Sequence, residues 1–182
     1  RAREFLKEFR ACEEKGEWYN FVIMLLPNDH TVGTREGYPT PRAAVADNDL
    51  ALGQIVEAVS HSRFWPETAI FVVEDDPQAG LDHVDGHRTV ALCISPYTRQ
   101  GNVVSAHYNQ NSMLRTMELI LGLPPMNQFD MAANPMYACF TNTPDTTPYT
   151  CRPNQIPLDE MNPKLASLRG KQLYYAQKSM EM

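Results

Sequence analysis

The sequence predicts an α/β domain with a layered sheet, in which at least three buried, mostly parallel strands are flanked by helices. Short apolar runs of strand-forming residues alternate with amphipathic segments of helical period over the first 121 residues. The apolar runs lack polar alternation, which is typical of strands that are covered on both faces. Polar loops follow these runs, at positions where many α/β domains bind their ligands.

Length and composition favour one globular domain. The chain has 182 residues, of which 43% are apolar and 21% charged, and this length suffices for one hydrophobic core but is tight for two. We expect residues 1–140 to form the main body, and 141–182 to add a Pro-rich wrap and a terminal helix to the same domain. The net charge of −6 argues against a nucleic-acid binder, because such proteins neutralise phosphates with basic side chains.

Two helices are predicted in the first 60 residues. Residues 2–15 carry apolar side chains at helical spacing, and Gly16 follows at a natural C-cap position. A second amphipathic helix is predicted from about 47 to 60, with Asp47 or Asn48 capping its first amides.

Three buried strands are predicted, at 18–26, 68–73 and 89–94, because aromatic and branched apolar residues are concentrated there. The longest uninterrupted apolar run has six residues, far below the roughly 20 that a membrane-spanning helix needs, so no membrane span is expected. A further helix is predicted at 111–121, where Gly122 and the prolines after it stop the helical pattern.

The C-terminal part of the sequence is rich in proline, since eight of the fourteen prolines fall in residues 124–163. We expect an extended wrap with little regular structure there. Pro163 begins a predicted terminal helix, which Gly170 weakens. Cys139 and Cys151 flank part of this stretch; whether they form a disulfide depends on the distance between their Cα atoms, so both possibilities stay open.

The loop after strand 68–73 holds the strongest functional signal. Within fourteen residues it carries five carboxylates and two imidazoles: Glu74, Asp75, Asp76, Asp82, Asp85, His83 and His87. Like charges at this density are costly unless a cation offsets them. Mixed Asp and His ligands suit Zn, Mn or Fe better than Ca, which prefers oxygen alone. The alternative interpretation is a solvated acidic turn with bystander histidines.

A second loop shows the same residue types, because Asp29 and His30 follow strand 18–26. If the two strands are parallel neighbours, their C-terminal ends lie at one edge of the sheet. We therefore expect both loops to contribute to one divalent-metal site, with the ligands Asp29, His30, Asp75, Asp76 and His87. His107 precedes the helix at 111–121 and is either a supporting group of this site or a polar residue near the helix cap.

Four ordered motifs resemble the phosphoesterase branch of the alkaline phosphatase superfamily, near the phospholipase C and acid phosphatase-like enzymes. They are LPNDHT, VADNDLALGQIVEAVSHSRFWPETAIFVVEDDPQAGLDHVDGHR, ISPY and HYNQNSMLRTMELILGLPPM, and the likeness covers about residues 21–140. The resemblance implies a metal-dependent hydrolase of phosphate esters, with one or two divalent ions, Zn or Mn, and a covalent Ser or Thr intermediate. It implies a phosphate-ester small molecule or a lipid head group as substrate.

The resemblance also assigns roles. Asp75 and Asp76 would ligate the ion that activates the nucleophile, and the other ion would be served by Asp29, His30 and His87. His83 would line the phosphate pocket or complete a coordination shell, and we group it with His107 as the catalytic candidates. In the superfamily the first Asp and His are spaced four residues apart, whereas Asp29 and His30 are adjacent here.

The superfamily's nucleophile lies in the N-terminal half of its fold, and no equivalent precedes residue 21 here. We therefore expect this chain to correspond to the C-terminal half of a catalytic domain, located in the periplasm or outside the cell. Apolar surface left by a missing half also predicts possible self-association. The alternatives are a non-catalytic α/β module that binds a metal ion or none, and, among enzymes, sulfatase or phosphomutase chemistry.

Overall fold

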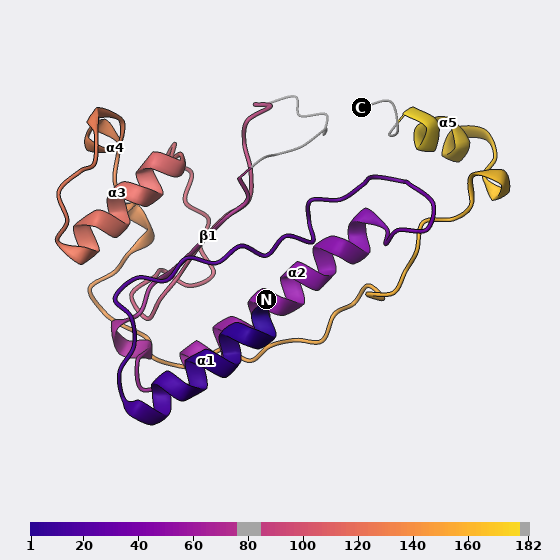
Figure 1. The fold of residues 1–182 in the computed structure, drawn as a ribbon. Coiled ribbons are helices and arrows are strands. Elements are labelled where there is room, and N and C mark those ends of the chain that lie inside the picture. The colour runs from indigo at the N-terminus through magenta and orange to yellow at the C-terminus, as the bar shows by residue number, and fades with distance from the viewer. Residues whose placement is uncertain (76–84, 179–182) are drawn as a thin grey trace. The chain divides into compact units, whose positions relative to one another are not determined.

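The computed structural model describes residues 1–75 and 85–178 (Figure 1). The chain divides into two compact units: unit 1 comprises Arg1–Ser62 and Pro148–Met182, and unit 2 comprises Arg63–Thr147. Both helices and strands are present, as the sequence predicts. None of the helices in the described residues has the length and hydropathy that a membrane crossing requires. The two units are described separately.

Unit 1 begins with helix α1, Ala2–Lys15, which confirms the predicted helix. It ends at Gly16, whose φ of 77° is a left-handed conformation that favours glycine. Phe9 is buried, and its ring packs edge-on against Trp18 with centroids 4.6 Å apart. Aromatic packing therefore fixes α1 to the segment that follows it.

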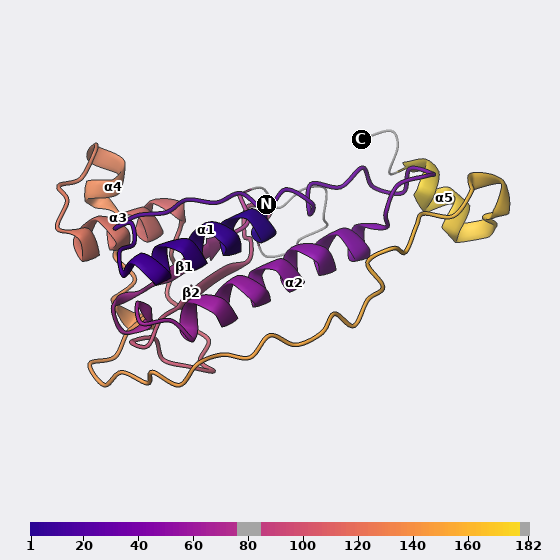
Figure 2. The same ribbon diagram turned by 60° about the horizontal axis from the view of Figure 1, so that its bottom comes forward.

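Helix α2, Pro41–Ser60, lies alongside α1 (Figure 2). It starts at Pro41 rather than near Asp47, so the predicted start is wrong. The reason is a strong local signal: the Thr40 side chain accepts a hydrogen bond from the Ala43 N–H, and proline at the first helical position is already set for helix. Asp47 and its neighbours consequently lie inside the helix.

The segment 18–26 forms no strand, which corrects the prediction of a buried strand there. Tyr19 is 71% exposed and Ile23 is 84% exposed. Burial of a strand on both faces requires neighbouring strands and covering layers. No β-ladder or isolated bridge joins this segment to another described residue, so its apolar composition alone does not make it a core strand.

The C-terminal segment completes unit 1. Its first part runs along α2: the Tyr149 N–H donates to Ser60 Oγ at 2.9 Å, and the Cys151 N–H donates to Glu57 Oε1 at 3.2 Å. Glycine at position 53 permits this close approach, because a Cβ there would lie 2.9 Å from Cys151 Sγ and the thiol would have to shift. The extended wrap predicted for this part is therefore present, held against α2 by side-chain hydrogen bonds.

The chain of unit 1 ends in the 3-10 helix η3, Leu165–Ser167, and in α5, Gly170–Lys178. The prediction that Pro163 begins the terminal helix is wrong. The helix begins at Gly170, which has a φ of 54°. Gly170 therefore stands at the start of the helix, where its conformational freedom is useful, and not within it.

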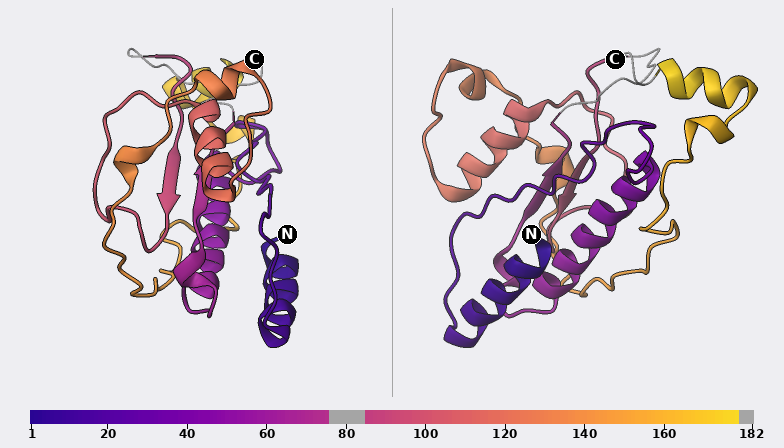
Figure 3. Two further views of the ribbon diagram at one scale, coloured as in Figure 1. Left: turned by 90° about the vertical axis from the view of Figure 1, so that its left-hand side faces the viewer. Right: turned by 45° about the vertical axis from the view of Figure 1, so that its right-hand side comes forward.

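Unit 2 contains the only strands among the described residues, β1, Ile70–Val73, and β2, Ala91–Ile94 (Figure 3). They pair antiparallel, with Phe71 opposite Cys93. This corrects the predicted sheet of at least three mostly parallel strands. A parallel pair needs a crossover connection, usually a helix, and the intervening sequence has no helical apolar pattern that would form one.

Helix α3, Gln110–Leu121, confirms the third predicted helix. Asn109 and Ser112 form a reciprocal capping box at its start, and Gly122, with a φ of 68°, ends it. Two short 3-10 helices, η1 (Trp65–Glu67) and η2 (Tyr137–Cys139), and helix α4, Gln128–Ala132, complete the unit. Its buried apolar side chains include Trp65, Met113 and Met136.

All four cysteines are free thiols, so Cys139 and Cys151 form no disulfide. Burial raises the pKa of Cys93 to about 12, and the nearby Cys139 adds to this effect. Both thiols of unit 2 are therefore protonated at neutral pH and behave as small apolar groups.

Candidate active site

The acidic and histidine-rich segment connects the two strands of unit 2. The ladder continues one step beyond β1, since the Glu74 N–H donates to the Val90 carbonyl at 3.1 Å. The two ends of this connection, at residue 75 and just before residue 90, therefore lie side by side at the end of the sheet. We call this place the neck of the connection. Antiparallel pairing, and not the predicted parallel sheet, brings the two ends of this segment together.

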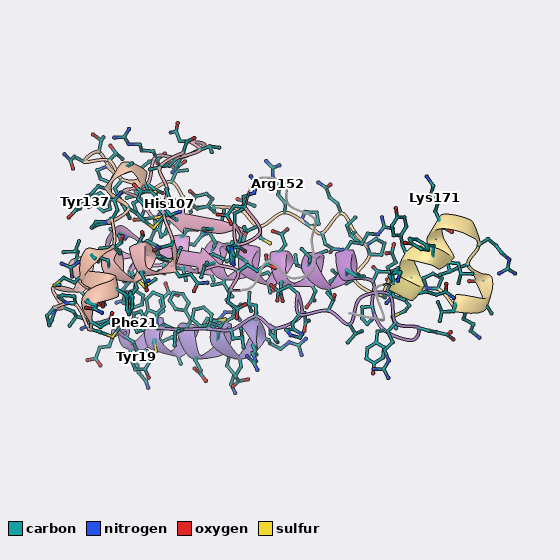
Figure 4. All side chains as sticks on the ribbon, turned by 90° about the horizontal axis from the view of Figure 1, so that it is seen from above. Tyr19, Phe21, His107, Tyr137, Arg152 and Lys171 are labelled. Carbon is teal, nitrogen blue, oxygen red and sulfur yellow. The ribbon has the colours of Figure 1, made fainter. Side chains whose placement is uncertain are left out.

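Asp75 lies at this neck with an exposed side chain. Its backbone carbonyl accepts a hydrogen bond of 3.2 Å from Gln110 Nε2, and Gln110 is the first residue of α3. The start of α3 is thus tied to the end of β1. His107 lies three residues earlier in the chain and is exposed (Figure 4), so this candidate belongs to the stretch that leads into the same helix.

His87 lies on the returning side of the neck. Its side chain is 99% exposed, and its Nδ1 is 3.3 Å from Asp85 Oδ1. The His87 backbone N–H donates to the same carboxylate oxygen at 2.9 Å. An exposed pair of this kind contributes little to stability, but it orients an imidazole and a carboxylate next to each other at the surface.

Asp76 and His83 lie outside the described residues. Within the described part of the chain, no three His, Cys, Asp or Glu side chains are grouped so that they could hold a metal ion. The described residues by themselves therefore do not form a metal centre, although Asp75 and His87 are donors of the right chemical type.

Asp29 and His30 belong to unit 1, where α2 anchors the start of their loop. The Asn48 side chain accepts from the Asn28 N–H at 3.3 Å and donates to the Leu26 carbonyl at 3.0 Å. The Asn28 side chain donates to Asp47. Asp29 is half-buried and His30 is exposed. Because the other candidate ligands belong to unit 2, convergence of the two loops stays a prediction.

The far end of this loop is anchored by a residue that sequence analysis assigned to no site. Asn162 is buried, and its Nδ2 donates to the carbonyls of Gly33, Arg35 and Pro39 at 3.0, 2.9 and 3.2 Å. Its backbone N–H donates to the Tyr38 carbonyl at 2.8 Å. Its only sequence signal was its place before Pro163, which is equally typical of a helix cap.

Beside Asn162, Glu160 connects the C-terminal segment to the start of α2. Its side chain accepts hydrogen bonds from Thr40 Oγ1 at 2.6 Å and from Arg42 Nε at 2.8 Å. Hydrogen bonds from Arg42 and Thr40 lower the pKa of Glu160 to about 2. An ion pair of two well-aligned bonds thus holds the segment that carries Asn162.

A second cluster of charges in unit 2 has a structural role. Burial works to raise the pKa of Asp130, but hydrogen bonds from the backbone N–H groups of Met126 and Asn127 outweigh burial, and the pKa is lowered to about 2. Glu118 pairs with Arg115 at 3.1 Å. The Asp130 carboxylate thus holds α4 and the turn before it. Asp130, Glu118 and Arg115 are not near any candidate ligand in sequence.

The chain is thus a mixed helix and strand protein, in which the candidate Asp75 follows β1 and the candidate His107 precedes α3. The model of the Phosphoesterase family matches residues 37–124. This match confirms the likeness to the phosphoesterase family that the motifs indicate. The matched segment includes Asp75, Asp76, His83, His87 and His107. Comparisons with curated proteins and with solved structures gave no match.

Proposed function

We propose that this chain contributes to metal-dependent hydrolysis of phosphate esters. The observation that carries the proposal is the match of residues 37–124 to the Phosphoesterase family, because that segment contains the acidic and histidine-rich connection between β1 and β2. Hydrolysis of phosphate esters is the activity that the family suggests, and the metal dependence rests on the residue types of the two loops.

In this proposal the two loops divide the work of binding. Asp75 and Asp76 hold one divalent ion at the neck, and the second ion is held by Asp29, His30 and His87. A divalent ion supplies Lewis-acid polarisation of the phosphoryl group. His83 and His107 would donate or accept protons at the substrate, which is the usual role of imidazole near neutral pH.

The substrate class follows from the same chemistry. An ion held by carboxylates and imidazoles binds phosphoryl oxygens and makes no demand on the group esterified to them. We therefore propose a phosphate monoester or diester of a small molecule, or a lipid head group.

Metal binding and hydrolysis test the proposal together. Purified chain is freed of metal with a chelator and titrated with Zn²⁺ or Mn²⁺ by calorimetry, and hydrolysis of p-nitrophenyl phosphate is followed with and without each ion. We expect one or two ions to bind and hydrolysis to depend on them. A chain that binds neither ion contradicts the proposal and supports the non-catalytic module instead.

A single substitution makes the test specific. Asp76→Asn removes one charged ligand and should weaken metal binding about 10-fold or more. Glu67→Gln is the matched control, because Glu67 is an exposed carboxylate of unit 2 at the end of η1, and it should leave metal affinity unchanged. Equal affinities of the two variants would assign Asp76 to a solvated turn.

A second candidate function, a non-catalytic α/β module, is favoured by one observation: the side chains of Asp75 and His87 are exposed, as in a solvated surface turn. In that case the acidic segment is a surface loop, and the chain acts by binding a partner.

A further inference from the structure

The two cysteines of unit 2, Cys93 and Cys139, belong to the same face of its sheet. Cys93 lies in β2, directly opposite Phe71 of β1. Residues that lie opposite each other in an antiparallel pair project from the same face of the sheet. The Phe71 ring contacts the ring of Phe140, with centroids 6.4 Å apart. The chain next to Cys139 therefore covers the face of the sheet that carries Cys93.

Backbone contacts hold Cys139 in this place. Cys139 is the last residue of η2, which lies next to the two strands and is drawn in orange in Figure 3. Its carbonyl accepts a hydrogen bond of 2.9 Å from the Arg99 N–H, and the next residue, Phe140, forms an antiparallel bridge with Thr98. The position of Cys139 is therefore fixed against the stretch that follows β2.

The two thiols are also chemically matched. Both are half-buried and free. Burial raises the pKa of Cys93 to about 12, and the nearby Cys139 adds to this rise, because two thiolates close together repel each other. A disulfide carries no charge, so it suits this apolar place better than two thiolates do. Cys12 and Cys151 belong to unit 1, so unit 2 brings together this one pair.

We propose that Cys93 and Cys139 form a disulfide when the chain folds in the presence of a disulfide oxidant, and that this bond fastens η2 to β2. The proposal does not depend on the proposed phosphoesterase function, because neither cysteine belongs to the candidate site.

The reaction is a thiol–disulfide exchange in two steps, written here for oxidised glutathione as the oxidant. One protein thiolate attacks a sulfur of the oxidant, which breaks the S–S bond of glutathione and releases one glutathione thiolate. The second protein thiolate attacks the protein sulfur of this mixed disulfide and releases the other glutathione thiolate. Two protein thiols are oxidised, one glutathione disulfide is reduced, and the two protons that the protein loses are taken up by the two glutathione thiolates.

Peptide mapping tests the proposal on the whole chain. The chain is refolded from urea in a mixture of reduced and oxidised glutathione, free thiols are alkylated, and the chain is digested with trypsin without reduction. We expect peptide 89–99, which contains Cys93, to be linked to peptide 116–164, which contains Cys139. Reduction should separate them. Four alkylated cysteines, or glutathione bound to either cysteine without the internal link, overturn the proposal.

The urea midpoint shows whether the bond fits the native structure. A disulfide that matches native geometry stabilises the fold by restricting the unfolded chain, here over the long loop from residue 93 to 139. We expect the linked chain to unfold at a higher urea concentration than the reduced chain. A midpoint that is no higher overturns the proposal, because the bond then forces together two sulfurs that the native fold keeps apart.

Two serine variants identify the cysteine that pairs with Cys93, since peptide 116–164 also contains Cys151. Cys139→Ser should abolish the link. Cys151→Ser is the matched control, because Cys151 is likewise a half-buried free thiol, and it should leave the link intact. A link that persists in Cys139→Ser and disappears in Cys151→Ser joins Cys93 to Cys151, and that result overturns the proposal.

Discussion

The loop 28–40 of unit 1 and the connection 74–90 of unit 2 carry the same kinds of candidate ligand but are supported differently. Loop 28–40 is anchored at one end by Asn48 and at the other by Asn162. The connection 74–90 is held at its neck by the strand ladder and by Gln110, and His87 has a local contact with Asp85. Pre-organised ligands bind more tightly than ligands that must be ordered by the ion.

This difference suggests a division of roles. In the proposed site, Asp29 and His30 are presented on a loop that hydrogen bonds hold at both ends. Asp75 and His87, the described candidates of the connection 74–90, both have exposed side chains, and their positions would depend more on the ion itself. Substitutions in the two regions test this contrast.

Asn162→Ala should give the largest effect. It removes the buried amide that donates to three carbonyls of loop 28–40, and buried acceptors left without a donor are costly. We expect the free energy of unfolding in urea to fall by about 2 kcal/mol. Asn154→Ala is the control, because exposed Asn154 makes one local bond to Ile156. Equal destabilisation by the two variants would show that loop 28–40 is not anchored at Asn162.

Glu160→Gln should have a smaller effect that depends on pH. The pKa of Glu160 is lowered from 4.5 to about 2 in the folded protein. A lowered pKa stabilises the fold above the unfolded value, near 4.5, and this contribution is lost as pH falls toward 2. The difference in urea midpoint between wild type and Glu160→Gln should therefore be full at pH 6 and shrink steadily below pH 4.5.

Arg42→Gln removes the other half of the same ion pair and should reproduce the pH dependence of Glu160→Gln. A difference in midpoint that stays constant from pH 6 to pH 2.5 would mean that the Glu160 carboxylate does not hold this segment through its charge.

His87→Asn should leave the urea midpoint of the chain unchanged, because its imidazole is almost fully exposed and pairs with one exposed carboxylate. The same substitution should weaken Zn²⁺ binding if the proposed ligand set is right. A clear loss of stability in the absence of metal would instead show that His87 supports the connection 74–90 structurally, as Asn162 supports loop 28–40.

The helices could be predicted from the sequence because their determinants are local. Apolar periodicity and a glycine C-cap define α1, and the polar residues around Asn109 together with Gly122 define α3. The start of α2 was missed because two good caps compete, and Thr40 with Pro41 is the stronger. Local signals therefore identify elements well and misplace an end where two signals overlap.

The strands depended on information that is not local. Apolar composition indicated strands at 68–73 and 89–94 but also at 18–26, and only the first two have a pairing partner in the described residues. The direction of pairing was wrong, because composition does not encode it. The sequence did place Asp75 and His87 in one connection, whereas it could not show that Asn48 and Asn162 hold the other loop, since their contacts span many residues of chain.

The division of the chain has a consequence for its biosynthesis. Unit 1 is made from Arg1–Ser62 and from Pro148 onward, with unit 2 inserted between them. A ribosome therefore delivers every residue of unit 2 before it delivers the segment that closes unit 1. During that interval the part of the chain that forms α1 and α2 lacks its contacts with Glu160 and Asn162. Unit 2 can therefore complete its folding first, while chaperones can bind the unfinished N-terminal part.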